Sequence, residues 1–333
     1  MILVTGATGH LGNVLVRELE QQGNTVRALV LPREDTTALE GTRAELVTGN
    51  ILDPASLDCA MQGVNTVFHM AALVSIEPGK EDILHQINVQ GTENVLQSAI
   101  KAGVRRFIYT SSIHALARPP LGVQIDESQP FDIHNEAGPY DRTKALASIK
   151  VLQANHSSME TVIVCPTGVL GPNDYRRSEM GELIIEWMNR KVAFLVKGMF
   201  DWVDVRDVAR AHILASQSGT PGQIYIISGH RVSLTGIRLA VANLTRNRSL
   251  AVTIPLPLAI WATYFTDLYY KMYRKRPRFT RYSLETINSN SLISSGKAQK
   301  ELGYQPRPFT ETIQDTVNWW LVNQKRIQSG LRI

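Results

Sequence analysis

The chain has 333 residues, of which 44% are hydrophobic and 20% are charged, an ordinary composition for a globular protein with ample core. Its formal net charge of +5 is modest for this length and does not by itself indicate a nucleic-acid partner. No apolar run reaches the roughly twenty residues needed to span a bilayer. The two cysteines, Cys59 and Cys165, stand among apolar residues without metal-ligand spacing, so we expect no metal site and reduced, buried thiols in a cytoplasmic protein.

Strand and helix patterns alternate along the first half of the chain. Residues 1–5 (MILVT) form an apolar run followed by glycine, which predicts a strand buried on both faces; a helix over 10–22 and a strand over 25–30 follow. Further strands are predicted at 44–48, 64–70, 105–110, 160–165 and 222–227, and further helices at 54–62, 81–102, 139–154 and 207–217. Such alternation predicts an α/β fold with a doubly wound parallel sheet.

The pattern changes after about residue 166. Segments 166–200 and 229–333 are richer in proline, arginine and aromatic residues, and a short return to the sheet pattern, 201–228, separates them. We therefore expect one domain of residues 1–165, completed by 201–228, and a smaller, discontinuous lobe of 166–200 and 229–333. A ligand cleft would lie between the two.

A glycine-rich turn links the first strand to the first helix. In TGATGHLG (5–12), Gly6 permits a tight turn, Gly9 lets the backbone approach a pyrophosphate, and Gly12 allows close helix packing. The helix N-terminus then offers free N–H groups to the phosphates. This context predicts that the first domain binds a dinucleotide.

The end of the second strand bears on the choice between NAD and NADP. An acidic residue there binds the ribose 2′-hydroxyl of NAD, whereas an arginine accommodates the 2′-phosphate of NADP. The chain reads ALVLPRED (28–35), without an acid at the strand end and with Arg33 just beyond it. We expect a preference for NADP over NAD; the alternative is that Arg33 is a solvated loop charge.

Tyr140 and Lys144 stand one helical turn apart in GPYDRTKA (138–145), so their side chains share one helix face. For an isolated pair, an exposed polar face is the ordinary explanation. A phenol titrates near pH 10, and a nearby ammonium would lower its pKa towards the range useful for proton transfer.

Several motifs in chain order resemble the extended short-chain dehydrogenase/reductase superfamily over nearly the whole chain. They are the three glycines, HMAA (69–72), NVQGT (88–92), YTSS (109–112), Tyr140-x-x-x-Lys144, PTGVLGP (166–172) and WVDVRDVA (202–209). The resemblance implies a Rossmann-type dinucleotide domain, a substrate-binding lobe and a catalytic group of Ser112, Tyr140 and Lys144. Ser112 would bind the reacting oxygen, Lys144 the nicotinamide ribose, and Tyr140 would transfer the proton while the nicotinamide transfers hydride.

The same resemblance assigns a larger set of residues to the cofactor. Besides Tyr140 and Lys144 they are Gly6, Thr8, Gly9, His10, Leu11, Gly12, Arg33, Asn50, Ile51, Ala71, Ala72, Thr110, Pro166 and Thr167. The family usually has Asp-Ile or Asp-Leu after the third strand to hold the adenine, whereas this chain has Asn50-Ile51. Asp53 could replace that carboxylate, but DPASL is typical of an N-cap followed by proline, and we assign Asp53 that structural role.

Neighbouring motifs narrow the reaction. Dehydratases of the superfamily carry Asp-Glu just after the serine, where this chain has Ile113 and His114, and nucleotide-sugar epimerases carry Phe-Asn where it has Pro166-Thr167. PTGVLGP and residues 294–320 are similar instead to the branch of dihydroflavonol 4-reductases and 3β-hydroxysteroid dehydrogenases, although Cys165 stands where that branch commonly has arginine.

We therefore expect an NADP-preferring oxidoreductase that interconverts a secondary alcohol and a ketone on a hydrophobic small molecule. One alternative is a nucleotide-sugar or sugar epimerase that uses the same Tyr–Lys pair, and another is a dinucleotide-binding protein without turnover. His114 and Tyr175 are candidate substrate contacts; a structural role for His114, capping the strand end, is equally compatible with the sequence.

Residues 256–281 combine an apolar face with a basic end. The face consists of residues at alternating three- and four-residue steps: Leu258, Trp261, Phe265, Leu268 and Met272. Six basic residues follow, from Lys271 to Arg281. One interpretation is a helix that covers the cleft, and the other is a peripheral membrane contact without a span. We otherwise expect a small-molecule substrate, no nucleic acid, and a monomer or homodimer.

Overall fold

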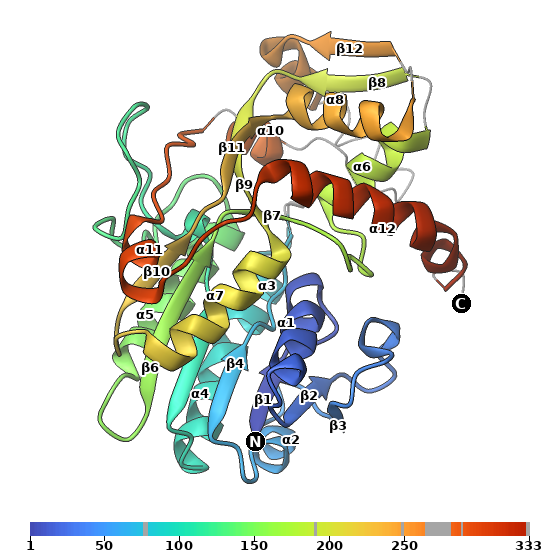
Figure 1. Ribbon diagram of the computed structural model, residues 1–333. Helices are drawn as coiled ribbons and strands as arrows, with labels where there is room; N and C mark the ends of the chain where they lie inside the picture. The colour runs from blue at the N-terminus through green and yellow to red at the C-terminus, as the bar shows by residue number, and fades with distance from the viewer. Residues whose placement is uncertain (76–78, 190–191, 248–249, 264–280, 288, 331–333) are drawn as a thin grey trace.

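The computed structural model describes residues 1–75, 79–189, 192–247, 250–263, 281–287 and 289–330. Its largest sheet has seven parallel strands in the order β10-β6-β5-β4-β1-β2-β3 (Figure 1). The strands are β1 (Ile2–Thr5), β2 (Val26–Val30), β3 (Glu45–Thr48), β4 (Thr66–His69), β5 (Arg106–Thr110), β6 (Glu160–Pro166) and β10 (Ile224–Ile227). All seven predicted strands are confirmed. The strand order reverses between β1 and β4, and ligands of such sheets bind at the carboxyl ends on either side of that point.

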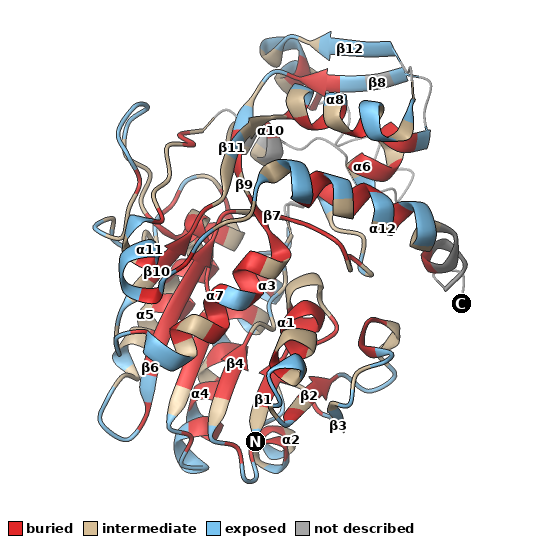
Figure 2. Ribbon diagram, in the orientation of Figure 1, coloured by how far each residue is buried: buried red, intermediate tan, exposed pale blue. Residues whose placement is uncertain are grey.

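Helices cover both faces of this sheet. On one face lie α1 (His10–Gln21), α7 (Val205–Ser218) and α11 (Gly296–Leu302); on the other lie α2 (Pro54–Ala60), α4 (Gly91–Lys101) and α5 (Pro139–Gln153). The predicted helix over 81–102 is interrupted: α3 (Glu81–His85) runs into a π-helical turn, η2 (Gln86–Gln90), and then into α4. The strands from β10 to β2 are almost entirely buried between the two layers, as Figure 2 shows, whereas the edge strand β3 is largely exposed.

A second group of elements stands above the carboxyl edge of the main sheet (Figure 1). It has a sheet of β11 (His230–Ser233), β9 (Met199–Asp204) and β7 (Gly168–Leu170), and a parallel pair, β8 (Val192–Val196) with β12 (Leu250–Ile254). Its helices are α6 (Glu179–Asn189), α8 (Leu234–Thr245), α10 (Arg281–Ile287) and α12 (Phe309–Gly330). Trp187 and Trp320 belong to its apolar core. We call this group the upper lobe.

The C-terminal part of the chain contributes to both groups. Although we assigned 229–333 to the substrate lobe, α11 packs under the main sheet: Ala298, Leu302 and Tyr304 belong to the same core as α1 and α7, and Tyr304 Oη donates to the Ser228 carbonyl at 2.8 Å. Conversely, residues 199–204 form β9 of the upper sheet. The division into a dinucleotide domain and a substrate lobe stays an interpretation.

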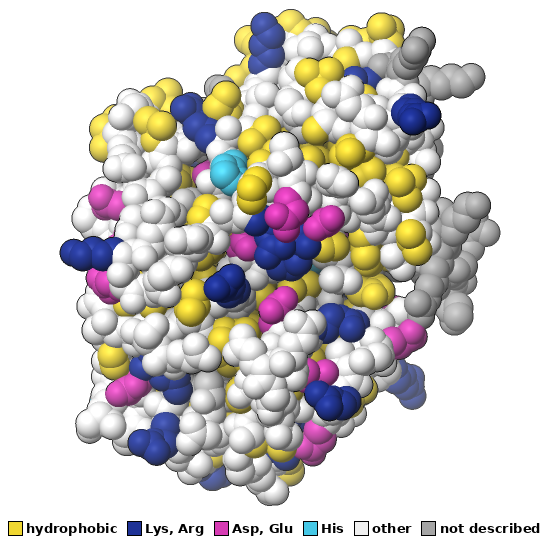
Figure 3. All heavy atoms as spheres, viewed as in Figure 1, with side chains coloured by type: hydrophobic (Ala, Val, Ile, Leu, Met, Phe, Trp, Pro, Cys, Tyr) yellow, Lys and Arg dark blue, Asp and Glu magenta, His cyan; other side chains and the backbone are white. Residues whose placement is uncertain are grey.

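Ion pairs join the main-sheet group to the upper lobe near points where the chain passes from one to the other. Arg206, at the start of α7, pairs with Asp204 at 2.8 Å and with Asp315 of α12 at 2.7 Å. Arg307 pairs with Asp207 at 2.9 Å and with Glu311 at 3.1 Å. On the described part of the face in Figure 3, acidic and basic side chains are interspersed in the same way.

The structure bears on the predictions for the two cysteines and for the apolar face of residues 256–281. Cys165 is buried in β6, but Cys59 is exposed, because the buried residues of α2 are Leu57 and Ala60; the prediction for Cys59 was wrong. No helix in the described part of the chain is both long and apolar enough to cross a membrane. Of the predicted apolar face, Leu258 and Trp261 are exposed, and its remaining members lie outside the described residues.

Candidate active site

The glycine turn is closely packed between β1 and the segment after β4. Gly6 has φ +67°, and a Cβ there would lie 2.7 Å from the Ala71 nitrogen, while a Cβ on Gly12 would lie 2.1 Å from the Gly6 carbonyl oxygen. Gly9 precedes α1, and among the described residues no side chain caps this helix and none in its first turn is acidic. An uncapped helix N-terminus beside glycines that carry no side chains suits the pyrophosphate of a dinucleotide, because backbone N–H groups can bind the phosphates there.

His10, a predicted residue of this turn, and Asn13, which was not predicted, contact the segment after β7. A ring nitrogen of His10 hydrogen-bonds with the Pro172 carbonyl at 2.9 Å, and the Asn13 amide donates to the Asn173 carbonyl at 3.1 Å. Thr8 is buried, and its hydroxyl donates to Glu34 at 2.6 Å. Leu11 is half-buried. The start of the segment after β7 is therefore attached to the first turn of α1.

The predicted adenosine end of the site holds one residue that sequence reasoning missed. Arg33 is exposed and has φ +62°. The next residue, Glu34, turns back so that its carboxylate accepts from the Leu31 N–H at 2.8 Å and from Thr8. No acidic residue directly follows β2 in the sequence, but the turn at Pro32 and Arg33 places the Glu34 carboxylate at the end of that strand. A turn of this kind has no hydrophobic periodicity, so the sequence pattern did not predict the position of Glu34.

After the third strand, the structure separates the two candidate acid replacements. The Asn50 side-chain oxygen accepts from the Leu52 N–H at 2.9 Å, so the amide nitrogen is what Asn50 can offer an adenine. Ile51 is buried against Gly91, where a Cβ would lie 2.6 Å from its Cδ1. Asp53 accepts from the Ala55 N–H at 3.1 Å and precedes Pro54, which confirms the N-cap prediction.

Ser112 and Tyr140 meet where β5 and the start of α5 converge. Ser112 follows β5, and its hydroxyl accepts from the His114 N–H at 3.2 Å. Burial raises the pKa of the Tyr140 phenol more than the neighbouring Ser112 hydroxyl lowers it, so Tyr140 is a protonated phenol at neutral pH.

Lys144 is buried and binds β5 rather than Tyr140. Its Nζ donates to Tyr109 Oη at 2.7 Å and to the Thr110 carbonyl at 2.5 Å, and it lies 4.2 Å from the centroid of the Tyr109 ring. Burial lowers the pKa of Lys144 to about 7. The expected lowering of the Tyr140 pKa by this ammonium is thus not what the structure gives, because Tyr109 takes the cation and burial dominates at Tyr140.

Further buried polar groups surround Tyr109 and the π-helical turn η2. The His69 ring, stacked on Tyr109 at 5.7 Å, hydrogen-bonds with Thr5 at 2.7 Å and with Thr92 at 3.0 Å, and burial lowers the pKa of His69 to about 3. On the π-helical turn, Asn88 accepts from the Leu73 N–H at 2.8 Å and donates to the Leu73 carbonyl at 3.0 Å. His69, Asn88 and Thr92 belong to the HMAA and NVQGT motifs, and we predicted no individual role for these three residues.

The remaining cofactor candidates lie at the carboxyl ends of β4, β5 and β6. Ala71 N–H donates to the Thr5 hydroxyl at 3.2 Å, and Ala72 is exposed. The Thr110 hydroxyl hydrogen-bonds with His212 at 2.8 Å, and Thr167, which follows Pro166, donates to Asp201 of β9 at 2.6 Å. The Thr110 and Thr167 hydroxyls therefore already have protein partners.

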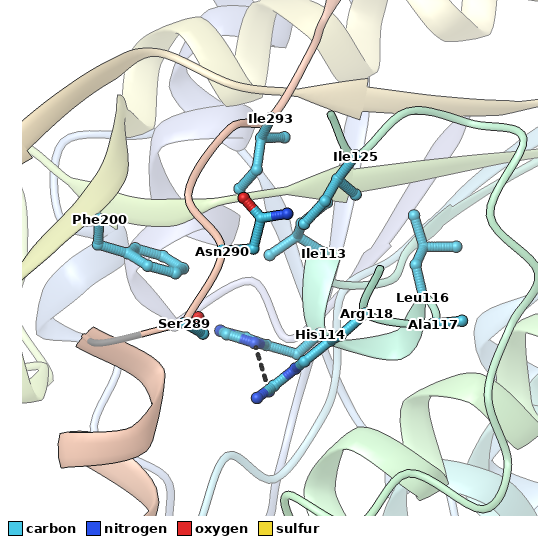
Figure 4. Close-up of a pocket in the computed structure, with 10 residues that line it drawn as sticks. All are labelled: Ile113, His114, Leu116, Ala117, Arg118, Ile125, Phe200, Ser289, Asn290 and Ile293. Carbon is cyan, nitrogen blue, oxygen red and sulfur yellow. Dashed lines mark hydrogen bonds between the residues drawn. The ribbon is translucent and has the colours of Figure 1, made fainter. Parts of the chain in front are cut away.

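A pocket opens beside Ser112 and is assembled from four separate segments (Figure 4). Its described lining residues are Ile113, His114, Leu116, Ala117, Arg118, Ile125, Phe200, Ser289, Asn290 and Ile293. His114 stacks on Phe200 with ring centroids 5.6 Å apart and an interplanar angle of 11°. Burial lowers the pKa of His114 to about 3, so the ring is neutral at physiological pH. His114 thus lines the pocket and also has its N–H bound to Ser112. Tyr175 is not among the lining residues; its ring packs against Trp319 at 5.2 Å.

A polar cluster beside the pocket was not predicted. Asp141, the neighbour of Tyr140, is buried and accepts from Arg118 at 2.9 Å and from Tyr282 Oη at 2.6 Å. Burial raises the pKa of Asp141 to about 6. A nitrogen of Arg118 also lies 3.3 Å from the His114 ring. Arg118 is therefore already neutralised where it meets the pocket. Because Tyr282 lies 141 positions away in the chain, no local pattern could have joined it to Asp141.

Comparisons with known proteins agree with this fold. The sequence profile of the 3-beta hydroxysteroid dehydrogenase/isomerase family matches residues 3–229. Sterol demethylase protein B of Methylococcus capsulatus is 34% identical over 96% of this chain and 97% of its own. A 4-hydroxy-2-methyl-3-oxo-4-farnesyl-3,4-dihydroquinoline-1-oxide ketoreductase of Stigmatella aurantiaca is 29% identical over 91% of both chains. The crystal structure of a DesIV double mutant, a dTDP-glucose 4,6-dehydratase from Streptomyces venezuelae with NAD bound, aligns with a TM-score of 0.79 at 21% identity, covering 99% of both chains.

Fold and motifs together define an enzyme of the extended short-chain dehydrogenase/reductase type with a Rossmann-like sheet. Within that class, the chain belongs to the 3-beta hydroxysteroid dehydrogenase/isomerase family. The predicted family resemblance and fold class are confirmed.

Proposed function

We propose that the protein is an NAD(P)-dependent oxidoreductase that interconverts a secondary alcohol and a ketone on a hydrophobic small molecule. The observation that carries the proposal is a largely apolar pocket with a neutral His114–Phe200 ring stack, whose lining starts at Ile113, directly after Ser112. Apolar pockets with a few convergent polar groups are typical of sites for small organic ligands.

In the proposed mechanism, Ser112 and Tyr140 bind the carbonyl oxygen of the ketone. The bound nicotinamide supplies the hydride. Tyr140 keeps its proton at neutral pH because burial raises its pKa, so it can donate that proton as negative charge develops on the oxygen. Lys144 holds the nicotinamide ribose.

The dinucleotide is held, in this proposal, by the residues that the sequence assigned to it. Its pyrophosphate lies on the Gly6–Gly12 turn and the open N-terminus of α1, where bare backbone and unpaired helix N–H groups suit phosphate. The preference for NADP stays a prediction that rests on Arg33.

The pocket favours an apolar substrate over a nucleotide diphosphate. Its described lining residues include one arginine, Arg118. The Arg118 guanidinium is paired with the Asp141 carboxylate at 2.9 Å and is therefore already neutralised. A diphosphate group is usually bound by arginines that are free to pair with it. The relatives named for sterol demethylation and for reduction of a farnesylated quinoline ketone also support a lipophilic substrate.

Thermal-shift measurements test the substrate class. Flat hydrophobic ketones should protect the protein when NADPH is present, and UDP-sugars should give no shift. Ligand that binds only the native state at a hundredfold excess over Kd raises stability by about 2.7 kcal/mol, which is readily detected. A shift with a UDP-sugar and none with the apolar ketones, together with dinucleotide retained through purification, would favour the epimerase. Dinucleotide binding without turnover of any ketone would favour a non-catalytic role.

Two expectations about surroundings complete the proposal. A cytoplasmic protein, monomeric or dimeric, would reach a lipophilic substrate through a peripheral membrane contact at 256–281. Exposed Leu258 and Trp261 support that contact. Co-sedimentation with anionic vesicles, compared between the native chain and Trp261→Ser, tests it: equal binding of the two proteins would contradict it.

A further inference from the structure

A residue of the upper lobe contacts the glycine turn at the end where adenosine would bind. Arg176, which follows β7 by six positions, donates through one nitrogen, Nη2, to the Thr8 hydroxyl at 2.9 Å and to the Glu34 carboxylate at 2.5 Å. The side chain of Thr8 lies between Gly6 and Gly9 of the turn. Arg176 therefore bridges the upper lobe, the glycine turn and the end of β2.

The position of Glu34 gives this bridge its meaning. One carboxylate oxygen accepts from Thr8 and Arg176, and the other accepts from the Leu31 N–H, so the acid is fixed beside the turn. In dinucleotide-binding folds, the carboxyl end of the second strand is where protein groups contact the 2′-position of the adenosine ribose. A carboxylate there accepts a ribose hydroxyl but repels a 2′-phosphate.

Arg176 changes that balance in two ways. It neutralises Glu34, which reduces the repulsion of a phosphate. In addition, every hydrogen bond that the described structure gives Arg176 uses Nη2, which leaves the Nε and Nη1 donors of its planar fork for an anion. Its side chain remains 44% exposed, so these donors are accessible to a ligand.

The segment that carries Arg176 is well anchored. Pro172 and Asn173 are bound to the first turn of α1, and the buried Asp174 carboxylate accepts from the Ser178 N–H at 2.9 Å and from the Ser178 hydroxyl at 2.7 Å. The backbone before Arg176 is therefore attached to α1, and the Asp174–Ser178 hydrogen bonds close the turn around Arg176.

We propose that Arg176 is a specificity-determining residue of the cofactor site, supplied by the upper lobe. With NAD, Glu34 accepts the ribose hydroxyl while Arg176 stays paired with Glu34. With NADP, Arg176 turns its fork to the 2′-phosphate and keeps the neighbouring carboxylate neutralised. The inference rests on the proposed dinucleotide binding, but it does not depend on any substrate or turnover.

The ordinary alternative is an interlobe ion pair with a structural role. Such partly exposed pairs contribute little to stability and would not discriminate between dinucleotides. The ratio of the NADPH and NADH dissociation constants separates the two explanations, because a purely structural loss changes both constants alike.

The test measures both dissociation constants by fluorescence titration for the native protein, Arg176→Ala, Arg176→Lys, Glu34→Gln and the double variant. Arg176→Ala should shift the ratio against NADPH by about tenfold or more, as expected for a charge-assisted contact. Arg176→Lys should restore part of it, since the charge remains without the fork. Glu34→Gln should shift the ratio towards NADPH, and the double variant should bind NADPH better than Arg176→Ala.

Arg177→Ala is the matched control, because Arg177 is the next residue but pairs with Glu182 at 2.5 Å within the upper lobe. It should leave the ratio unchanged, and thermal unfolding of each free variant reports whether it folds. An unchanged ratio in folded Arg176→Ala and Glu34→Gln, with the native protein binding both dinucleotides, would overturn the role of Arg176 alone. Native protein that binds neither dinucleotide would overturn the proposed function as well.

Discussion

The carboxyl edge of the main sheet and the pocket beside it are built from different kinds of contact. At the sheet edge, buried polar side chains hold one another in place: Lys144 binds Tyr109 and the Thr110 carbonyl, and Asn88 binds both backbone groups of Leu73. The pocket is formed mainly by apolar packing, with an aromatic stack of His114 on Phe200.

This difference determines which of the two regions tolerates substitutions. An unpaired polar group left in the buried network would cost about 1–3 kcal/mol, so each member of the network depends on its partners. Apolar linings exchange side chains of similar volume at less than about 1.5 kcal/mol. We therefore expect the proton-transfer apparatus to tolerate few substitutions, while substitutions in the pocket alter which ketone is accepted.

The strongest test of the comparison is Tyr140→Phe. The ring packs as before and only the proton donor is lost, so kcat should fall by on the order of 10²–10⁴-fold. Thermal unfolding and the dinucleotide dissociation constant should be unchanged. Retained turnover in the folded variant would remove Tyr140 from the mechanism.

Arg33→Ala tests the exposed end of the same sheet edge. If Arg33 binds the 2′-phosphate, its removal should weaken NADPH more than NADH by very roughly 1.5–3 kcal/mol. Titration of both dinucleotides measures the difference. Equal losses would show that Arg33 is a solvated loop charge, in keeping with its exposure.

Phe200→Leu tests the pocket. Loss of the aromatic surface should raise the KM for a flat ring ketone, since aromatic pairs contribute about 0.5–1.5 kcal/mol beyond their burial. The dinucleotide dissociation constant should not change. Phe194→Leu is the control, because Phe194 is 51% exposed on β8 and does not line the pocket. A similar change in KM in both variants would argue against a ring contact at Phe200.

Lys144→Met tests whether burial of the Lys144 ammonium makes the stability of the protein depend on pH. Because burial lowers the pKa of Lys144 from 10.5 to about 7, the native state binds fewer protons than the unfolded state between these values. The Lys144 contribution to stability is therefore present above pH 10.5 and is lost as the pH falls through 7. The melting temperature of the variant, relative to the native protein, should be higher by several degrees at pH 7 than at pH 10.

Lys150→Met, on the same helix, is the control for this measurement. Lys150 is partly exposed and pairs with Glu93 at 2.5 Å, so its removal should give a much smaller change of relative melting temperature with pH. Parallel pH profiles for Lys144→Met and the native protein would show that Lys144 is not destabilised by burial.

The sequence was sufficient where a feature depends on neighbouring residues. The seven strands follow from short apolar runs, and the glycine spacing predicts the closely packed turn at Gly6 and Gly12. Alternation along β5 would also have directed Tyr109 towards the face covered by α5, where Lys144 finds it.

Contacts between distant segments could not be predicted in this way. The Asp141–Tyr282 hydrogen bond and the Arg176–Glu34 pair join residues more than a hundred positions apart. Charge on a side chain says nothing about which remote partner neutralises it. The same limit applies to Tyr175, for which the loop sequence gave no hint of the ring contact with Trp319.

The repeated passage of the chain between the two lobes restricts how the molecule can open. The backbone crosses after β6, again between β9 and α7, between β10 and β11, between α10 and α11, and once more between α11 and α12. A hinge made of one linker allows a wide swing, because only a few dihedral angles change. Here several parallel connections would have to bend together. Ligand entry should therefore proceed by local displacement of loops, and exchange of the whole upper lobe with that of a relative would require matching every crossing.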